Sequence, residues 1–178
     1  VIWGMGYGGG SNAMYALINE DHGNSEVAYN TLYRTIKMME EAVENLKKEY
    51  NLNFSVLATP AESLAGRFCK IDRKEFGLIP NVTDRDYYIN SFHIDVKEKI
   101  GIFDKIKKEA QFHALTRGGH ITYVELDGEA KKNVSVILKI VKAMKDKQIG
   151  YGSINHPVDK CKDCGTEMII NDECPICG

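Results

Sequence analysis

Four of the five cysteines lie in the last eighteen residues, in two Cys-x-x-Cys pairs. The pairs are Cys161 with Cys164 and Cys174 with Cys177, and nine residues separate them. Each pair can direct two sulfurs at one ion, and the spacer is long enough for a hairpin that brings the pairs together. Four thiolates at about 2.3 Å around Zn²⁺ are the expected result, and such a closed site is structural rather than catalytic. Disulfides or free thiols are the alternative, which paired spacing in a cysteine-poor chain disfavours.

A second candidate site follows a short apolar stretch near the middle of the chain. Its residues are Thr59, Pro60, Ala61, Glu62 and Ser63. Threonine at N-cap, proline at N1 and glutamate at N3 form a capping box, which predicts a helix from here to about Arg67. Free N–H groups and the helix dipole at such a start can bind an anion. An ordinary capped helix is the alternative, and the pattern alone favours it.

The remaining reactive side chains are scattered. His93, His113, His120 and His156 show no metal-like spacing, so we interpret each as a hydrogen-bonded scaffold residue. Asn155 and His156 follow a predicted strand, at the end where α/β folds place their sites. Cys69 stands alone, and we interpret it as a small buried residue.

The first ten residues are rich in glycine, at positions 4, 6, 8, 9 and 10. A phosphate-binding glycine loop needs a strand before it and a helix after it, and neither is evident here. Ser11-Asn-Ala-Met14 has the look of a protease-cleavage scar before a start methionine. We therefore interpret residues 1–13 as a segment added by cloning, outside the domain.

Periodic apolar positions predict the elements that hold these residues. A helix capped by Ser25 runs to about Tyr50, and a short helix is expected around Tyr87, capped by Thr83. Further predicted elements are a buried strand at 54–58, helices at 104–115 and 134–144, and strands at 120–126 and 149–154. The last strand, helix and strand form a βαβ unit, which implies parallel neighbours. The chain is thus α/β over residues 14–156, with a zinc ribbon over residues 157–178.

Composition limits the function classes. The 178 residues carry a net charge of −2, which gives no electrostatic reason to expect nucleic acid as a partner. The ribbon itself is acidic, a poor match for phosphate backbones. No apolar run approaches the roughly 20 residues that span a bilayer, so we expect no membrane partner. Paired Cys-x-x-Cys spacing in an otherwise cysteine-poor chain indicates a reducing compartment, so we expect a cytoplasmic protein.

Several strings, in this order, are typical of one family. They are Leu57-Ala-Thr-Pro-Ala-Glu62, Thr83-Asp-Arg85, Asn90-Ser-Phe-His93, Gly119-His-Ile-Thr-Tyr123 and Ile149-Gly-Tyr-Gly-Ser-Ile-Asn-His-Pro157, followed by the cysteine pairs. From about Asp21 to Gly178 the chain resembles the C-terminal third of the anaerobic (class III) ribonucleoside-triphosphate reductases.

The resemblance implies a ten-stranded α/β barrel that reduces ribonucleotides to deoxyribonucleotides by radical chemistry. A glycyl radical, installed by a radical S-adenosylmethionine activase, serves that chemistry. A homodimer is among the expected partners. Substrate phosphates lie on a helix start, to which the Thr59–Ser63 turn corresponds. The family's zinc site corresponds to Cys161, Cys164, Cys174 and Cys177.

The sequence departs from the family in lacking an equivalent of the glycyl-radical segment and of the radical-bearing cysteine loop. We therefore expect a fragment of the reductase that is inactive by itself. The alternative is a non-catalytic zinc-ribbon interaction module on a reductase-like scaffold.

Overall fold

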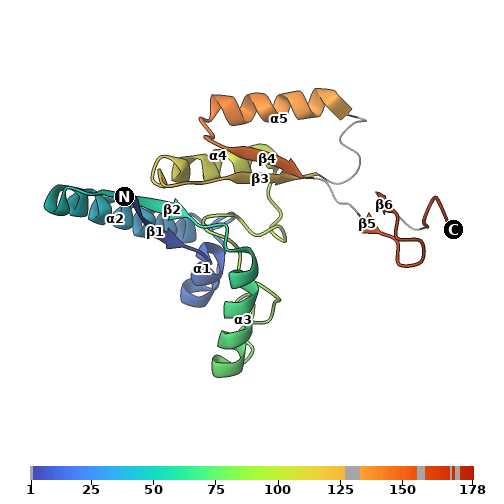
Figure 1. The fold of residues 1–178 in the computed structure, drawn as a ribbon, viewed down its shortest axis with the longest axis horizontal. Coiled ribbons are helices and arrows are strands. Elements are labelled where there is room, and N and C mark those ends of the chain that lie inside the picture. The colour runs from blue at the N-terminus through green and yellow to red at the C-terminus, as the bar shows by residue number, and fades with distance from the viewer. Residues whose placement is uncertain (1, 127–132, 156–158, 169, 171–172) are drawn as a thin grey trace.

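Two pairs of parallel strands form the framework of the protein (Figure 1). The computed structural model describes residues 2–126, 133–155, 159–168, 170 and 173–178. Strand β1 (Ile2–Tyr7) pairs with β2 (Asn53–Ala58), and β3 (Thr122–Glu125) pairs with β4 (Gly152–Asn155). A single parallel bridge between Leu57 and Gly119 joins the two pairs, so β2 lies beside the segment that leads into β3.

The connection from β1 to β2 consists of α1 (Gly10–Ile18) and α2 (Glu26–Tyr50). The prediction of the long helix is confirmed, because the Ser25 hydroxyl accepts a hydrogen bond from the Ala28 N–H at 3.2 Å. The helix ends at Asn51, whose left-handed backbone (φ 50°) stops it. Its buried side chains recur at helical spacing: Ala28, Tyr29, Leu32, Ile36 and Val43.

The first core lies between α2 and the end of β2. Aromatic rings dominate it, and the rings of Phe92 and Phe112 stack with their centroids 5.3 Å apart. The second core lies between the β3–β4 pair and the helices α4 (Ile102–His113) and α5 (Val134–Asp146). Helix α4 serves both cores, because Phe112 belongs to the first and Ile106 to the second. The predicted βαβ unit is confirmed as β3–α5–β4 with parallel strands.

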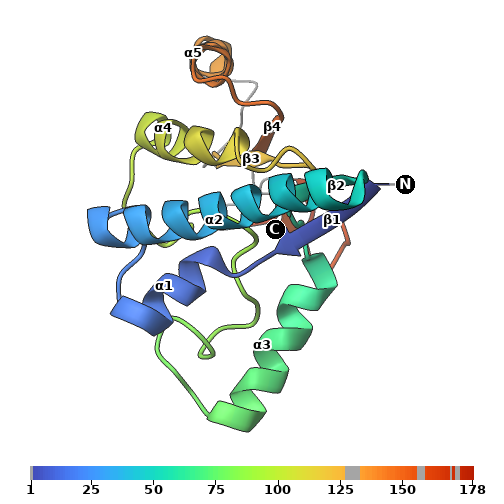
Figure 2. The ribbon, with the colours of Figure 1, turned by 90° about the vertical axis from the view of Figure 1, so that its left-hand side faces the viewer.

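Helix α3 (Glu62–Phe76) projects from the carboxyl ends of β1 and β2 (Figure 2). It is longer than the helix predicted to end near Arg67, because its second half packs on the loop that follows. Cys69 is fully buried, and its sulfur lies 2.9 Å from the carbonyl oxygen of Arg85. The interpretation of Cys69 as a small buried residue is therefore confirmed.

The short helix predicted around Tyr87 does not form, and a turn at residues 80–83 and a bend at residues 84–87 take its place. The side chain of Arg73 donates to the carbonyl oxygens of Thr83 and Arg85. The Thr83 hydroxyl, predicted to cap a helix, instead accepts from the Ile79 N–H at 2.7 Å and donates to the Gly77 carbonyl. The side chains of Arg73 and Thr83 thus form hydrogen bonds with backbone groups that a helix would have used.

The interpretation of residues 1–13 as lying outside the domain is wrong. Residues 2–7 form β1, which is in register with the whole of β2. Ser11 and Asn12 are buried in the first turn of α1. The Asn12 side chain donates to the Asn81 carbonyl and accepts from the Ile89 N–H, so this segment fastens α1 to a distant loop.

The C-terminal part is a small hairpin of β5 (Asp159–Lys160) and β6 (Glu167–Met168), which pair antiparallel. Among the described helices, none is both long enough and apolar enough to cross a membrane.

Candidate functional site

The four cysteine sulfurs of the C-terminal hairpin converge on one point. Their Sγ atoms all lie within 4.8 Å of one another. The Cys161–Cys177 sulfurs are 3.5 Å apart and the Cys164–Cys174 sulfurs 3.7 Å apart. Bonds of about 2.3 Å from a tetrahedral zinc ion require sulfurs about 3.8 Å apart. The described residues therefore present a donor set that fits Zn²⁺.

The two halves of the cluster have the same backbone geometry. The N–H of Gly165 donates to the Cys161 carbonyl at 3.0 Å, and the N–H of Gly178 donates to the Cys174 carbonyl at 2.9 Å. Both glycines have positive φ, 72° and 86°, as predicted from their place directly after each pair. Each turn thus holds its two sulfurs on one side of the backbone.

Hydrogen bonds favour the thiolate form of two of the cysteines, Cys161 and Cys164. Backbone N–H groups of Cys164 and Asp163 lower the pKa of Cys161. The Thr166 side chain, 3.2 Å from the Cys164 sulfur, lowers the pKa of Cys164 to about 6. The neighbouring sulfurs raise the pKa of Cys177 to about 12, so four thiolates coexist only around a cation.

A cavity of about 440 Å³ lies at the carboxyl ends of β1 and β2, beside the start of α3. Thr59 and Ala61 of the predicted anion-binding turn line it, whereas Pro60 and Ser63 are exposed. Glu62 is the first residue of α3. The cavity therefore adjoins the helix start that the sequence predicted as an anion site.

The predicted capping box is absent from this turn. The N-cap position is Ala61, which has no side-chain cap, and the Thr59 hydroxyl faces the Leu57 carbonyl at 3.4 Å. The Ala61 N–H instead donates to the side chain of Asn90 at 3.2 Å. A residue distant in sequence thus replaces the local cap.

The glycine segment lines the same cavity, which sequence reasoning missed. Contrary to the sequence prediction, a strand precedes its last glycines and a helix follows them, namely β1 and α1. However, the N–H groups of Gly9 and Gly10 already donate to the carbonyls of Ile89 and Ser91. Gly6 is required by close approach, since a Cβ there would lie 2.3 Å from the Thr59 Oγ1. The segment therefore shapes the cavity, whose wall also includes Ala61, Leu64 and Ala65 at the start of α3.

A second cavity, of about 370 Å³, lies at the carboxyl ends of β3 and β4. Asn155 lines it, at the strand end where a site was expected, together with His93 and Lys105. His156 lies outside the described residues. Both cavities share the wall formed by Ala65 and residues 88–90, so they adjoin along the ends of all four strands.

His93, His113 and His120 are held in hydrogen bonds, as the scaffold interpretation of these three residues requires. His93 Nε2 lies 2.8 Å from the Ile121 carbonyl, and burial lowers its pKa. His113 accepts from the Gly150 N–H at Nδ1 and contacts the Thr122 hydroxyl at Nε2. His120 Nδ1 lies 2.9 Å from the Thr116 carbonyl.

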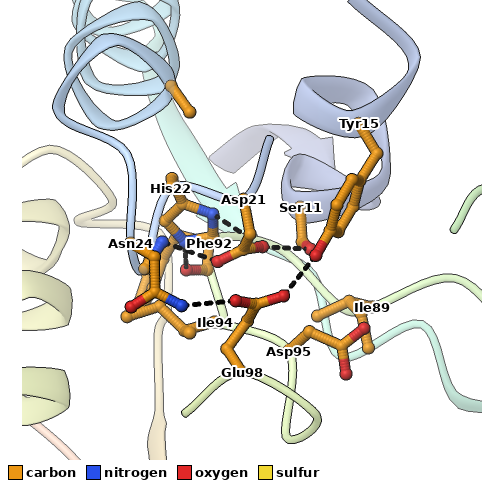
Figure 3. A network of polar contacts seen from close by, with 12 residues as sticks. Ser11, Tyr15, Asp21, His22, Asn24, Ile89, Phe92, Ile94, Asp95 and Glu98 are labelled. Atoms are coloured by element: carbon orange, nitrogen blue, oxygen red, sulfur yellow. Dashed lines mark hydrogen bonds and ion pairs between the residues drawn. The ribbon is translucent and has the colours of Figure 1, made fainter. Parts of the chain in front are cut away.

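A buried polar network joins α1 to the following loop (Figure 3). The Ser11 hydroxyl donates to the Asp21 carboxylate at 2.5 Å, and His22 Nδ1 lies 3.6 Å from the same group. Burial opposes the ionisation of Asp21, but the neighbouring His22 and the hydrogen bonds from the Ser11 hydroxyl and the Gly23 N–H outweigh it and lower the pKa. Tyr15 and Asn24 both donate to Glu98. No local sequence pattern marks this network, which fixes α1 in place.

Comparison with known proteins identifies the family of the chain. The sequence model of the anaerobic ribonucleoside-triphosphate reductases matches residues 1–178. The chain belongs to this family. It is 44% identical over 133 residues to the anaerobic ribonucleoside-triphosphate reductase of enterobacteria phage T4, covering 70% of this chain and 21% of the phage protein. It is 36% identical over 183 residues to the Salmonella typhimurium reductase, covering 98% and 25%.

Solved reductase structures have the same fold. An anaerobic ribonucleotide reductase structure matches 98% of this chain and 27% of its own, with a TM-score of 0.71 and 23% identity. The Thermotoga maritima enzyme with glycerol in its active site matches 98% of this chain and 28% of its own, with a TM-score of 0.68 and 20% identity. The resemblance inferred from the sequence is confirmed. This reductase-family chain spans a fifth to a quarter of the curated relatives it matches.

Proposed function

We propose that this chain contributes the substrate-phosphate site and a structural zinc site to an anaerobic ribonucleoside-triphosphate reductase. The observation that carries the proposal is the cavity at the start of α3, in a chain of the reductase family. In the whole enzyme, the two parallel strand pairs would form part of a ten-stranded α/β barrel. The adjoining cavities would then face the inside of that barrel.

The cavity suits a phosphate for three reasons. Its wall includes the start of α3, where unbonded N–H groups and the helix dipole favour an anion. The Tyr7 hydroxyl is buried and has no hydrogen-bond partner among the described residues. Burial raises the pKa of Tyr7, so this group keeps its proton and remains a donor. A polar ligand in the cavity would accept from the N–H groups at the start of α3.

The cysteine cluster would hold Zn²⁺ as a structural ion. Four protein ligands leave no open coordination position, so the ion would stabilise the hairpin rather than take part in the reaction. When bound, zinc would cross-link the turn at Cys161–Cys164, which the two-residue β5–β6 ladder closes, to the turn at Cys174–Cys177.

By itself, the 178-residue chain is expected to reduce no ribonucleotide. Cys69, the cysteine outside the cluster, is fully buried against the Arg85 carbonyl and is not open to a substrate. Turnover would need the thiyl and glycyl radicals of the whole enzyme and its separate activase, as the resemblance implies.

Two substitutions at one position test the phosphate site. Glu62→Pro and Glu62→Ala both remove the same carboxylate, but only the first removes the N–H at the start of α3. Proline is compatible with the first position of a helix. We expect a ribonucleoside triphosphate to bind about tenfold more weakly to Glu62→Pro than to Glu62→Ala, by titration calorimetry, because a hydrogen bond to a charged group is lost.

The unphosphorylated nucleoside is the ligand control, and its affinity should not distinguish the two variants. Equal triphosphate affinities of Glu62→Pro and Glu62→Ala would exclude the start of α3 as the phosphate site.

A further inference from the structure

The segment Ile89–Ser91 crosses between the two loops that end β1 and β2. Its backbone is fixed to the start of α1, because the Gly9 N–H donates to the Ile89 carbonyl at 2.8 Å and the Gly10 N–H to the Ser91 carbonyl at 3.0 Å. The Asn12 side chain accepts from the Ile89 N–H at 2.7 Å. The segment therefore has little freedom to shift.

From this fixed segment, the side chain of Asn90 reaches the other loop. Its Oδ1 accepts the Ala61 N–H at 3.2 Å, directly before the first residue of α3. An N–H can only donate, so this contact assigns Oδ1 to Ala61 and leaves Nδ2 facing elsewhere. Asn90 thus links the glycine segment to the Thr59–Ser63 turn.

Asn90 also lines both strand-end cavities. Among the described residues that line the larger cavity, none is a lysine or arginine. None of the described residues accepts a hydrogen bond from Asn90 Nδ2. A bound phosphate would therefore depend on neutral donors, and the Nδ2 amide is one of them.

We propose that Asn90 positions the Thr59–Ser63 turn through Oδ1 and donates from Nδ2 to a phosphate bound there. This inference rests on the proposed function and adds a specific side chain to it. The ligand class is a polyphosphate such as the triphosphate of a nucleotide, whose oxygens accept neutral N–H donors.

Two variants separate the two roles. Asn90→Asp keeps an acceptor for the Ala61 N–H but replaces the Nδ2 donor with a negatively charged oxygen. Asn90→Ala removes both. Asn53→Asp is the matched control, because it adds the same charge on an exposed residue at the opposite end of β2.

Two measurements are made on the full chain: amide hydrogen exchange at Ala61 without ligand, and the dissociation constant of sodium tripolyphosphate. We expect Asn90→Asp to keep the slow exchange of Ala61 and to weaken tripolyphosphate binding by at least tenfold. Asn90→Ala should speed the exchange and weaken binding by a smaller factor. Asn53→Asp should alter neither.

Each contrary result overturns a defined part. Unchanged Ala61 exchange in Asn90→Ala overturns the positioning role, whether or not a phosphate binds. Wild-type affinity in Asn90→Asp, with Glu62→Pro still impaired, overturns the donor role and leaves the proposed function standing. Absence of tripolyphosphate binding to the wild-type chain overturns the proposed function and the donor role together, and the exchange of Ala61 then still decides the positioning role.

Discussion

The imidazole ring centroids of His113 and His120 lie 4.1 Å apart, where α4 leads into β3. Burial, aided by the charges that His120 and His93 can carry, lowers the pKa of His113 to about 3. Its hydrogen bond from the Gly150 N–H also requires an unprotonated Nδ1. The folded chain therefore holds this histidine in its neutral form.

Acid should destabilise the protein through His113. Its ordinary pKa is about 6.5, so between pH 6.5 and 3 the unfolded chain binds a proton that the folded chain does not. The contribution of neutral His113 to the free energy of unfolding is fully present above about pH 6.5. It is lost as the pH falls, by at most about 1.4 kcal/mol per pH unit. Urea unfolding across this range measures the slope.

The matched variant is His113→Asn, which has no proton to gain. It should be less stable at pH 7 but should lose stability less steeply on acidification than the wild type. Parallel curves for the two proteins would show that His113 does not titrate as inferred.

Gly6 should tolerate no side chain. An alanine Cβ would lie 2.3 Å from the Thr59 Oγ1, so we expect Gly6→Ala to cost about 1–3 kcal/mol of unfolding free energy. Gly4→Ala on the same strand is the control, since nothing lies within 4 Å of its Cβ position. Thr59→Ala should rescue much of the Gly6→Ala loss in the double variant. Denaturant unfolding compares all four proteins, and equal losses at Gly4 and Gly6 would contradict the clash.

One zinc ion should bind per chain, through the cysteine cluster. Cys164→Ser replaces a thiolate with a poorer ligand and should lower the zinc content measured by elemental analysis well below one. Cys69→Ala is the control, because that cysteine is buried far from the cluster in sequence and in contacts. Equal zinc loss in both variants would argue against the four-thiolate site.

Asp95 should matter to stability through Arg85. The two side chains form an ion pair at 2.6 Å and are only 3% and 8% exposed. Asp95→Asn leaves the guanidinium buried without its counter-charge, so a loss of about 3–5 kcal/mol is expected. Glu41→Gln breaks an exposed pair with Lys37 and should cost under about 1 kcal/mol. Thermal unfolding of the two variants decides whether the buried pair differs from the exposed one.

The sequence was informative wherever the interaction is local. The Ser25 cap lies three residues from the N–H that it satisfies, and each cysteine pair closes its own turn. These features depend on neighbours that a reader of the sequence can see. The corresponding predictions, the long helix and the converging thiolates, therefore agree with the structure.

Two of the failed predictions have a different origin. The cap predicted at Thr59 was displaced because the Ala61 N–H finds Asn90, 29 positions away. The glycine segment appeared to lack a strand because its partner, β2, lies more than forty residues further along. No local pattern records such pairings. The sequence therefore predicted the turn that lines the strand-end cavity but not the glycine segment and Asn90 on its other side.

Helix α4 places Phe112 in one core and Ile106 in the other, only six residues apart. Each strand pair has its own core and its own helices. Because one rigid helix completes both, melting either half withdraws apolar contacts from its neighbour. The α/β part of the chain should consequently unfold in a single cooperative transition. A destabilising substitution near β4 should therefore also destabilise the pairing of β1.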